Sequence, residues 1–174
     1  VSGAYNLTLK LYELAHTHSP VDHILKASLF PMRVLADTIH ESCHLSILAH
    51  GKLVLIAEEL SPDRVRISVE VGSQVNPIPF ASGRLLISFL EPQAQATFLQ
   101  ADSDYQAMSR AKRDQFHSDL KSLRRLGYTM IDSVARIGVD LAVIVGNPED
   151  AVTAALAVPF LAGGRNHGRE QDTM

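Results

Sequence analysis

Three residues in the first third of the sequence have the types and spacing to bind a catalytic metal ion. His40, Glu41 and His44 match the His-Glu-x-x-His motif of zinc peptidases. In that motif both histidines bind one zinc ion from a single helix face, and the glutamate acts as the general base. His50 also stands where the three-histidine subclass has its third ligand. The chemistry that this pattern offers is metal-assisted hydrolysis.

The elements around the motif argue against a zinc site. Apolar residues recur at helical spacing only as far as Ile39, whereas a shared metal ion needs His40 and His44 on one continuous helix. From Cys43 onward apolar and polar residues alternate, which predicts a strand that would separate the two histidines by roughly 13 Å. We therefore expect Glu41 at a helix end, Cys43 in the core and His44 in a strand. A zinc-dependent hydrolase that uses His40, Glu41 and His44 stays the alternative.

The composition indicates one domain that works outside the membrane. A chain of 174 residues with 46% hydrophobic residues is long enough for one buried core. The net charge of -3 gives no overall attraction to nucleic acid or to an anionic membrane. The single cysteine, Cys43, excludes an internal disulfide and fits a reducing, cytoplasmic compartment. The longest apolar runs are shorter than the roughly 20 residues that span a bilayer.

Hydrophobic periodicity predicts a chain that mixes helices and strands. Helices are expected over residues 7–15, 21–39 and 81–90, after Pro92, and through residues 116–123 up to a cap at Gly127. Strands are expected over residues 43–49, 52–59, 65–71, 128–132, 139–145 and 152–160. His50 and Gly51 form the predicted turn between the first two strands. Residues 101–111 are polar and unpatterned, which predicts a loop.

A series of short motifs runs through almost the whole chain in a definite order. The motifs are Glu41-Ser42-Cys43-His44-Leu45, Val71-Gly72-Ser73, Ala81-Ser82-Gly83-Arg84, Arg124-Arg125-Leu126-Gly127-Tyr128, Gly138 and Ala155-Leu156-Ala157-Val158-Pro159. In this order and spacing they resemble the effector-binding domain of the IclR family of bacterial transcription regulators. The first motif corresponds to an E-T-x-H/N-L element of that family, which accounts for the apparent protease motif.

The resemblance implies an α+β, GAF-like (profilin-like) fold, in which a curved, mostly antiparallel sheet with helices packed on it encloses a pocket. It implies a sensor of a small organic acid effector rather than an enzyme, without a cofactor or a metal, and a homodimer or homotetramer. DNA would be contacted only through a winged helix-turn-helix domain that these 174 residues do not contain. Residues 1–18 would end an interdomain linker helix, residues 19–162 would form the effector-binding domain, and residues 163–174 a disordered tail.

The residues themselves predict an anion site at Ala81. A helix that starts there leaves the backbone N–H groups of Ala81, Ser82 and Gly83 free at its positive end, where a carboxylate is favoured. The Ser82 hydroxyl could add a hydrogen bond, and Gly83 would allow a close approach of the backbone. The alternative is that Ser82 only caps the helix and Gly83 only packs.

The family's pocket positions add apolar lining residues, carried over through the resemblance. They are Ile67, Val75, Val139, Leu141, Ala157 and Pro159. Some family members have serines and a cysteine at matching positions and bind very small keto acids. Apolar walls with one anion site predict a carboxylate with an aromatic or aliphatic body, because unpaired polar groups are costly to bury. A GAF-like domain that serves only oligomerisation, without a pocket, is the third alternative.

Overall fold

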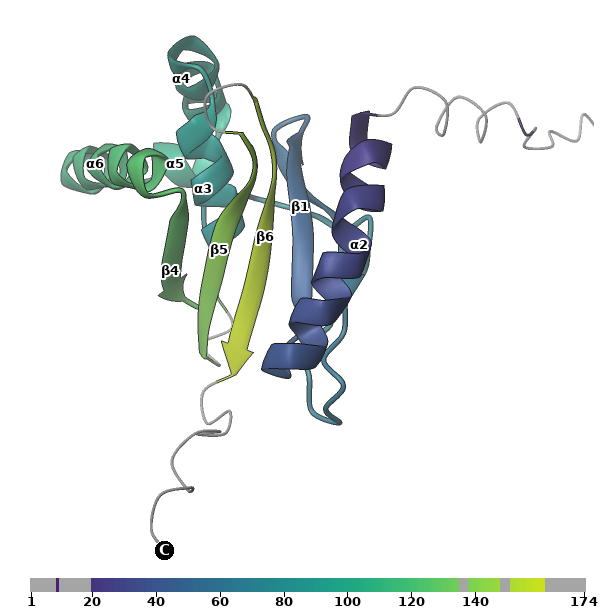
Figure 1. Cartoon of the computed structure of the whole chain (residues 1–174). Helices are drawn as coiled ribbons and strands as arrows, with labels where there is room; N and C mark the ends of the chain where they lie inside the picture. The colour runs from purple at the N-terminus through teal and green to yellow at the C-terminus, as the bar shows by residue number, and fades with distance from the viewer. Residues whose placement is uncertain (1–8, 10–19, 135–137, 148–150, 162–174) are drawn as a thin grey trace, which may run out of the picture.

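Antiparallel strand pairing builds one twisted sheet. The computed structural model describes residue 9 and residues 20–134, 138–147 and 151–161, and within them six strands lie in the order β3-β2-β1-β6-β5-β4 (Figure 1). The strands are β1 (Cys43–Ala49), β2 (Lys52–Glu59), β3 (Gln74–Val75), β4 (Tyr128–Asp132), β5 (Gly138–Asn147) and β6 (Ala151–Leu161). All pairs of neighbouring strands in the described residues are antiparallel. The predicted α+β, GAF-like fold class is confirmed.

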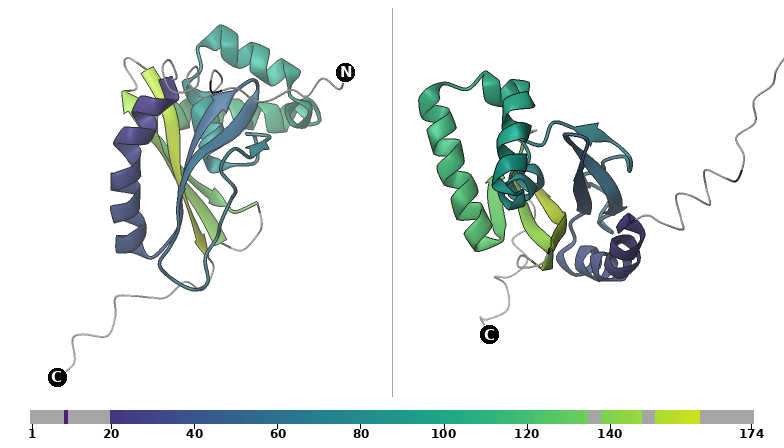
Figure 2. Two further views of the ribbon diagram at one scale, coloured as in Figure 1. Left: turned by 90° about the vertical axis from the view of Figure 1, so that its right-hand side faces the viewer. Right: turned by 90° about the horizontal axis from the view of Figure 1, so that it is seen from above.

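Helices cover both faces of this sheet. The helix α2 (Pro20–Ile39) lies on one face, beside β1. The other face carries α3 (Ala81–Phe89), which contacts β5 and β6 and packs against α6 (Arg110–Leu126), with α4 (Pro92–Ala101) and α5 (Ser103–Gln106) between them in sequence. Two further views show α2 and the α3–α6 group on different sides of the sheet (Figure 2). A functional site on the α3 side is therefore separated from α2 by the sheet.

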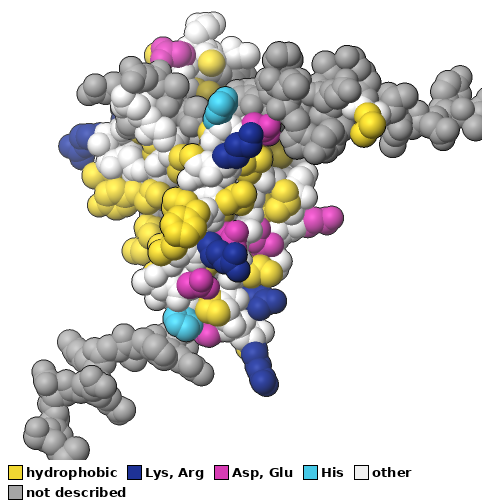
Figure 3. Space-filling model, turned by 45° about the vertical axis from the view of Figure 1, so that its right-hand side comes forward, with side chains coloured by type: hydrophobic (Ala, Val, Ile, Leu, Met, Phe, Trp, Pro, Cys, Tyr) yellow, Lys and Arg dark blue, Asp and Glu magenta, His cyan; other side chains and the backbone are white. Residues whose placement is uncertain are grey.

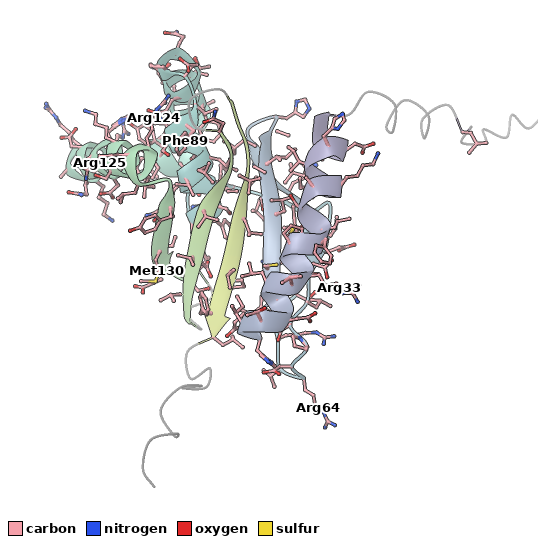
Figure 4. The ribbon with its side chains drawn as sticks, viewed as in Figure 1. Arg33, Arg64, Phe89, Arg124, Arg125 and Met130 are labelled. Atoms are coloured by element: carbon pink, nitrogen blue, oxygen red, sulfur yellow. The ribbon has the colours of Figure 1, made fainter. Side chains whose placement is uncertain are left out.

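Arg124 ties α6 to the end of α3. Its guanidinium donates to the backbone oxygens of Ser88 and Leu90, at 3.3 and 3.0 Å, and lies 5.8 Å from the ring centre of Phe89 (Figure 4). The helix α6 then ends at Gly127, whose φ of 74° is left-handed and whose N–H donates to the oxygen of Leu123. The predicted C-terminal cap is confirmed, and it directs the chain into β4.

Strand alternation divides the side chains of β1 between the two faces. Cys43 and Leu45 are 0% exposed and pack against Met32 and other residues of α2. His44 lies between them in sequence and faces the opposite side, where α3 packs. The thiol of Cys43 is thus core, as expected, and burial raises its pKa to about 11.

The hairpin between β1 and β2 is confirmed. His50 and Gly51 have φ angles of 50° and 76°, both positive, as a two-residue turn with the twist of the flanking strands requires. The helix α2 begins at Pro20, close to the expected start at residue 21, and it continues through Pro31.

Two expected elements are wrong. Residues 65–71 form no strand, and the N–H of Val69 donates to the carboxylate of Glu58 at 2.7 Å instead of to the backbone of a neighbouring strand. Residues 101–111 hold α5 and the start of α6 instead of a loop. Their polar residues are caps, since Asp102 accepts from the N–H of Tyr105 and Ser109 from that of Lys112.

The expected linker helix (residues 1–18) and tail (residues 163–174) lie outside the described residues, apart from residue 9. Within the described ranges, none of the helices has the length and apolar character needed to cross a bilayer.

Candidate functional site

A cavity of about 430 Å³ lies between the α3 side of the sheet and the segment that follows β2. We refer to residues 60–73 as the covering segment, since Ile67, Val69 and Ser73 form part of the cavity wall. The predicted binding residues that line this cavity are Ile67, Val75, Ala81, Ser82, Ala157 and Pro159. The structure thus brings together residues from the covering segment, β3, α3 and β6 around one space.

Val139 and Leu141 are not among the lining residues. Val139 pairs with Phe160 and Leu141 with Val158, and these partners pack on the α2 side of the sheet. Asp140, between them in sequence, takes the cavity-facing position instead. The two pocket positions carried over from the family on β5 are thus off by one residue, and a one-residue shift moves each side chain of a strand to the other face.

The start of α3 presents free backbone donors to the cavity. Its N-cap residue is Phe80, in an extended conformation and without a side-chain cap, so Ser82 lies inside the helix and does not cap it. Ala81 and Ser82 are 1% and 5% exposed and both line the cavity. In the described part of the chain no acceptor contacts the N–H groups of Ala81, Ser82 or Gly83. These donors lie at the positive end of the helix, where an anion is favoured.

Gly83 packs against protein and does not line the cavity. A Cβ atom at this position would overlap the backbone of Pro77. The same turn is fixed by the Nε of Arg84, which donates to the oxygen of Ile78 at 2.7 Å, and by the side chain of Asn76, which accepts from the N–H of Ile78. Gly83 therefore positions the start of α3 against the preceding loop, and the packing alternative describes it correctly.

Polar residues that the sequence did not single out for binding form another part of the wall. Among them are His44, Ser133 and Asp140. Burial lowers the pKa of His44, while the nearby carboxylates of Glu58 and Asp140 act in the opposite direction. Burial raises the pKa of Asp140, opposed by a hydrogen bond with Ser133 and by the proximity of His44. The signal for Asp140 was present, because it is the one charge in the apolar run Val139–Val145.

Glu58 connects the polar part of the cavity wall to the covering segment. Its carboxylate lies 3.2 Å from the Nε2 atom of His44, and it accepts hydrogen bonds from the N–H of Val69 at 2.7 Å and the hydroxyl of Ser68 at 3.1 Å. The Glu58 side chain is only 12% exposed, so these contacts are less weakened by water than surface contacts. The carboxylate holds the covering segment in place.

The histidines of the apparent zinc motif contact different carboxylates. His40 lies beyond the end of α2 with a φ of 57°, and its Nδ1 is 3.1 Å from an oxygen of Asp63. His44 lies in β1 and contacts Glu58. Within the described residues, no group of three or more His, Cys, Asp or Glu side chains could hold a metal ion. The helix that a shared zinc site would need ends at Ile39.

Comparison with known proteins identifies the domain type. The family model for the C-terminal domain of the bacterial transcriptional regulator IclR matches residues 17–173. An IclR transcriptional regulator from Alicyclobacillus acidocaldarius is 20% identical with a TM-score of 0.71, over 94% of this chain and 67% of that one. An IclR homologue from Microbacterium hydrocarbonoxydans, complexed with 4-hydroxybenzoate, is 20% identical with a TM-score of 0.72, over 88% of this chain and 65% of that one.

A third solved structure, from Silicibacter sp. TM1040 and described as an ICLR regulator, is 24% identical with a TM-score of 0.76, over 94% of this chain and 66% of that one. The chain thus spans about two thirds of the length of these three relatives. No curated protein is similar enough in sequence to count as a match.

Replacing Gly83 by alanine tests the close packing at the start of α3. We expect Gly83→Ala to lower the free energy of unfolding by about 1–3 kcal/mol, because the backbone of Pro77 has to move to admit the methyl group. Without such a neighbour the same change inside a helix raises stability by roughly 0.5–1 kcal/mol. Denaturant unfolding followed by circular dichroism measures the difference, and a gain in stability would contradict the packing described here.

Removing the Glu58 carboxylate tests its hold on the covering segment. Hydrogen bonds to a charged group contribute about 1.5–3 kcal/mol each, so Glu58→Ala should accelerate amide exchange in residues 66–72 by roughly tenfold or more. Hydrogen–deuterium exchange with mass spectrometry reports it directly. Glu59→Ala is the matched control, because this neighbour on β2 makes neither contact. Unchanged exchange in Glu58→Ala would show that other contacts hold the segment.

Proposed function

We propose that the cavity of this domain binds a small organic acid. The premise is that the chain belongs to the IclR family of bacterial transcriptional regulators, of which it forms the C-terminal domain. Family and structural neighbours are transcriptional regulators and not enzymes. In this proposal the domain senses the acid, and its occupancy changes how the complete regulator acts on DNA. In the same proposal, DNA is contacted through a winged helix-turn-helix domain and not through the domain described here.

One observation carries the proposal: the free N–H groups at the start of α3 adjoin a cavity whose walls are mainly apolar. The two features have different roles. Burying an apolar body contributes about 25 cal/mol per Å², whereas a charge at a helix end contributes about 0.3–1 kcal/mol at an exposed site and up to about 2 kcal/mol when partly buried. The walls therefore supply most of the affinity, and the helix end orients the carboxylate.

The size and lining of the cavity favour a monocyclic aromatic or an aliphatic acid. A space of about 430 Å³ lies in the ordinary range for small-molecule sites. Leu53, Leu55 and Phe80 add apolar surface to the predicted lining residues. The Microbacterium hydrocarbonoxydans homologue, solved with 4-hydroxybenzoate, supports an aromatic acid as the effector class.

Titration calorimetry of the 174-residue chain with benzoate, hexanoate, succinate and glucose tests the proposal. We expect benzoate or hexanoate to bind, and Ala157→Leu to weaken that binding at least about tenfold, because the added side chain fills space that the ligand needs. Ala111→Leu, an exposed change on α6, is the matched control and should bind as the wild type does. Exclusive binding of succinate or glucose would contradict the proposal. No binding of any acid would favour a domain used only for oligomerisation.

We further propose that the domain forms a homodimer or homotetramer through apolar surface left uncovered beside α2. Hydrophobic side chains gather on this side of the molecule (Figure 3). On β4 and β5, Tyr128, Met130 and Val143 are 51%, 65% and 37% exposed, and Phe30 on α2 is 76% exposed. Tyr128 pairs directly with Val143, so the sheet residues form one patch. Exposed apolar patches of this kind commonly mark protein interfaces.

A charge placed in this patch tests the assembly. Met130 projects from β4 away from α6 (Figure 4), and Met130→Glu should shift the chain toward the monomer, because an unpaired carboxylate is costly to bury in an interface. Light scattering after size-exclusion chromatography measures the mass. Leu126→Glu, an exposed apolar position at the end of α6, is the control. A wild type that is monomeric at every concentration would contradict the proposed assembly.

A further inference from the structure

We infer that His44, Ser133 and Asp140 form a second polar subsite, which accepts a hydrogen bond from a hydroxyl group of the ligand. The acids that this cavity selects are then hydroxy acids, with the carboxylate at one end and the hydroxyl at the other. The inference rests on the proposed function, because the same ligand must place its carboxylate at the start of α3. It adds a specificity-determining group, Asp140, that neither the sequence motifs nor the comparisons assign.

The strand register places the two polar regions at a useful separation. Asp140 pairs with Pro159, and both line the cavity. Ala81 at the start of α3 packs in one cluster with Ala142 and Ala157, which pair with each other two residues further along the same strands. At a rise of about 3.3 Å per residue, two residues correspond to roughly 7 Å along the sheet. The two polar regions therefore lie at different positions along the strands, and a ligand that reaches both needs a polar group at each end.

The subsite consists mainly of acceptors. The Asp140 carboxylate already takes a hydrogen bond from Ser133 and has further lone pairs. His44 is 7% exposed, and burial lowers its pKa, which favours the neutral ring. Its Nε2 faces the Glu58 carboxylate, which can only accept, so Nε2 carries the proton and Nδ1 is an acceptor. A wall that presents carboxylate oxygens and a neutral imidazole of this tautomer accepts a hydrogen bond from a ligand donor.

This arrangement discriminates between related acids. A ligand hydroxyl donates a hydrogen bond to Asp140, whereas an unsubstituted ring has no donor for that carboxylate. A second carboxylate at the same place faces a like charge in a partly buried site. Hydrogen bonds to charged groups are stronger than neutral ones, so the hydroxy acid should bind on the order of tenfold tighter than the acid without the hydroxyl. The dicarboxylate should bind more weakly than either.

Calorimetry of the wild-type 174-residue chain with 4-hydroxybenzoate, benzoate and terephthalate measures this order directly. We expect 4-hydroxybenzoate to bind about tenfold tighter than benzoate, and terephthalate to bind most weakly of the three. Equal affinity for 4-hydroxybenzoate and benzoate would overturn the hydroxyl subsite and leave the proposed acid-binding function standing. Absence of binding for all three acids, together with benzoate and hexanoate failing in the earlier panel, would overturn both.

A pair of matched variants assigns the preference to Asp140. In Asp140→Asn the charge is lost and the preference for 4-hydroxybenzoate over benzoate should fall below about threefold, while terephthalate gains affinity because the like charge is gone. Asp132→Asn makes the same change at an exposed residue of β4 outside the cavity wall and should keep the wild-type order. Full retention of the preference in Asp140→Asn would overturn the assignment. If this variant does not fold, the wild-type comparison of the three acids decides.

Discussion

The covering wall of the cavity depends on one largely buried carboxylate. Glu58 joins His44 on the sheet to Ser68 and Val69 in the covering segment, through contacts of 2.7–3.2 Å. The covering segment forms no strand. At its end the N–H of Gly72 donates to the oxygen of Leu55, and the oxygen of Ser73 accepts from the N–H of Leu55. Further back in the segment the side chain of Glu58 takes the N–H of Val69. Without this carboxylate, the stretch around Ile67 and Val69 would lose the hydrogen bonds of Ser68 and Val69 to the sheet, and this wall of the cavity would be held less firmly. The wall that a ligand meets is thus held in place by electrostatics as well as by packing.

The two faces of the sheet differ in how completely they are filled. Toward α2, large side chains such as Met32 and Leu45 pack with little exposure. Toward α3, the sheet residues near the helix start are small, among them Ala157 and Pro159. The paired residues of β1 and β6 run from Ser46 and Ala155 to His44 and Ala157. Pro159 lies beyond this paired stretch, so no residue of β1 needs a backbone N–H from it, and a proline is tolerated there. Small side chains and the departure of β1 together leave the space.

Local signals account for what the sequence predicted correctly. The hairpin at His50 and Gly51, the start of α3 at Ala81 and the cap at Gly127 each depend on residues close together in the chain. The segment 65–71 alternates like a strand, but its fate depends on Glu58, and no local pattern contains that contact.

The cavity residues on β5 were assigned wrongly for another reason. Between residues 138 and 147 most side chains are apolar whichever face they occupy, including the exposed Val143, so the sequence carries no alternation from which the cavity face can be read. The resemblance therefore led to Val139 and Leu141, whereas pairing with β6 turns Asp140 to the cavity. A charged residue inside such an apolar run is costly to bury unless it is paired or hydrogen-bonded. Asp140 was therefore the better guide to the face that lines the cavity. If the proposed acid binds, Asp140 at one end of the cavity and the amides of Ala81 and Ser82 at the other would favour one orientation, with its carboxylate at the start of α3.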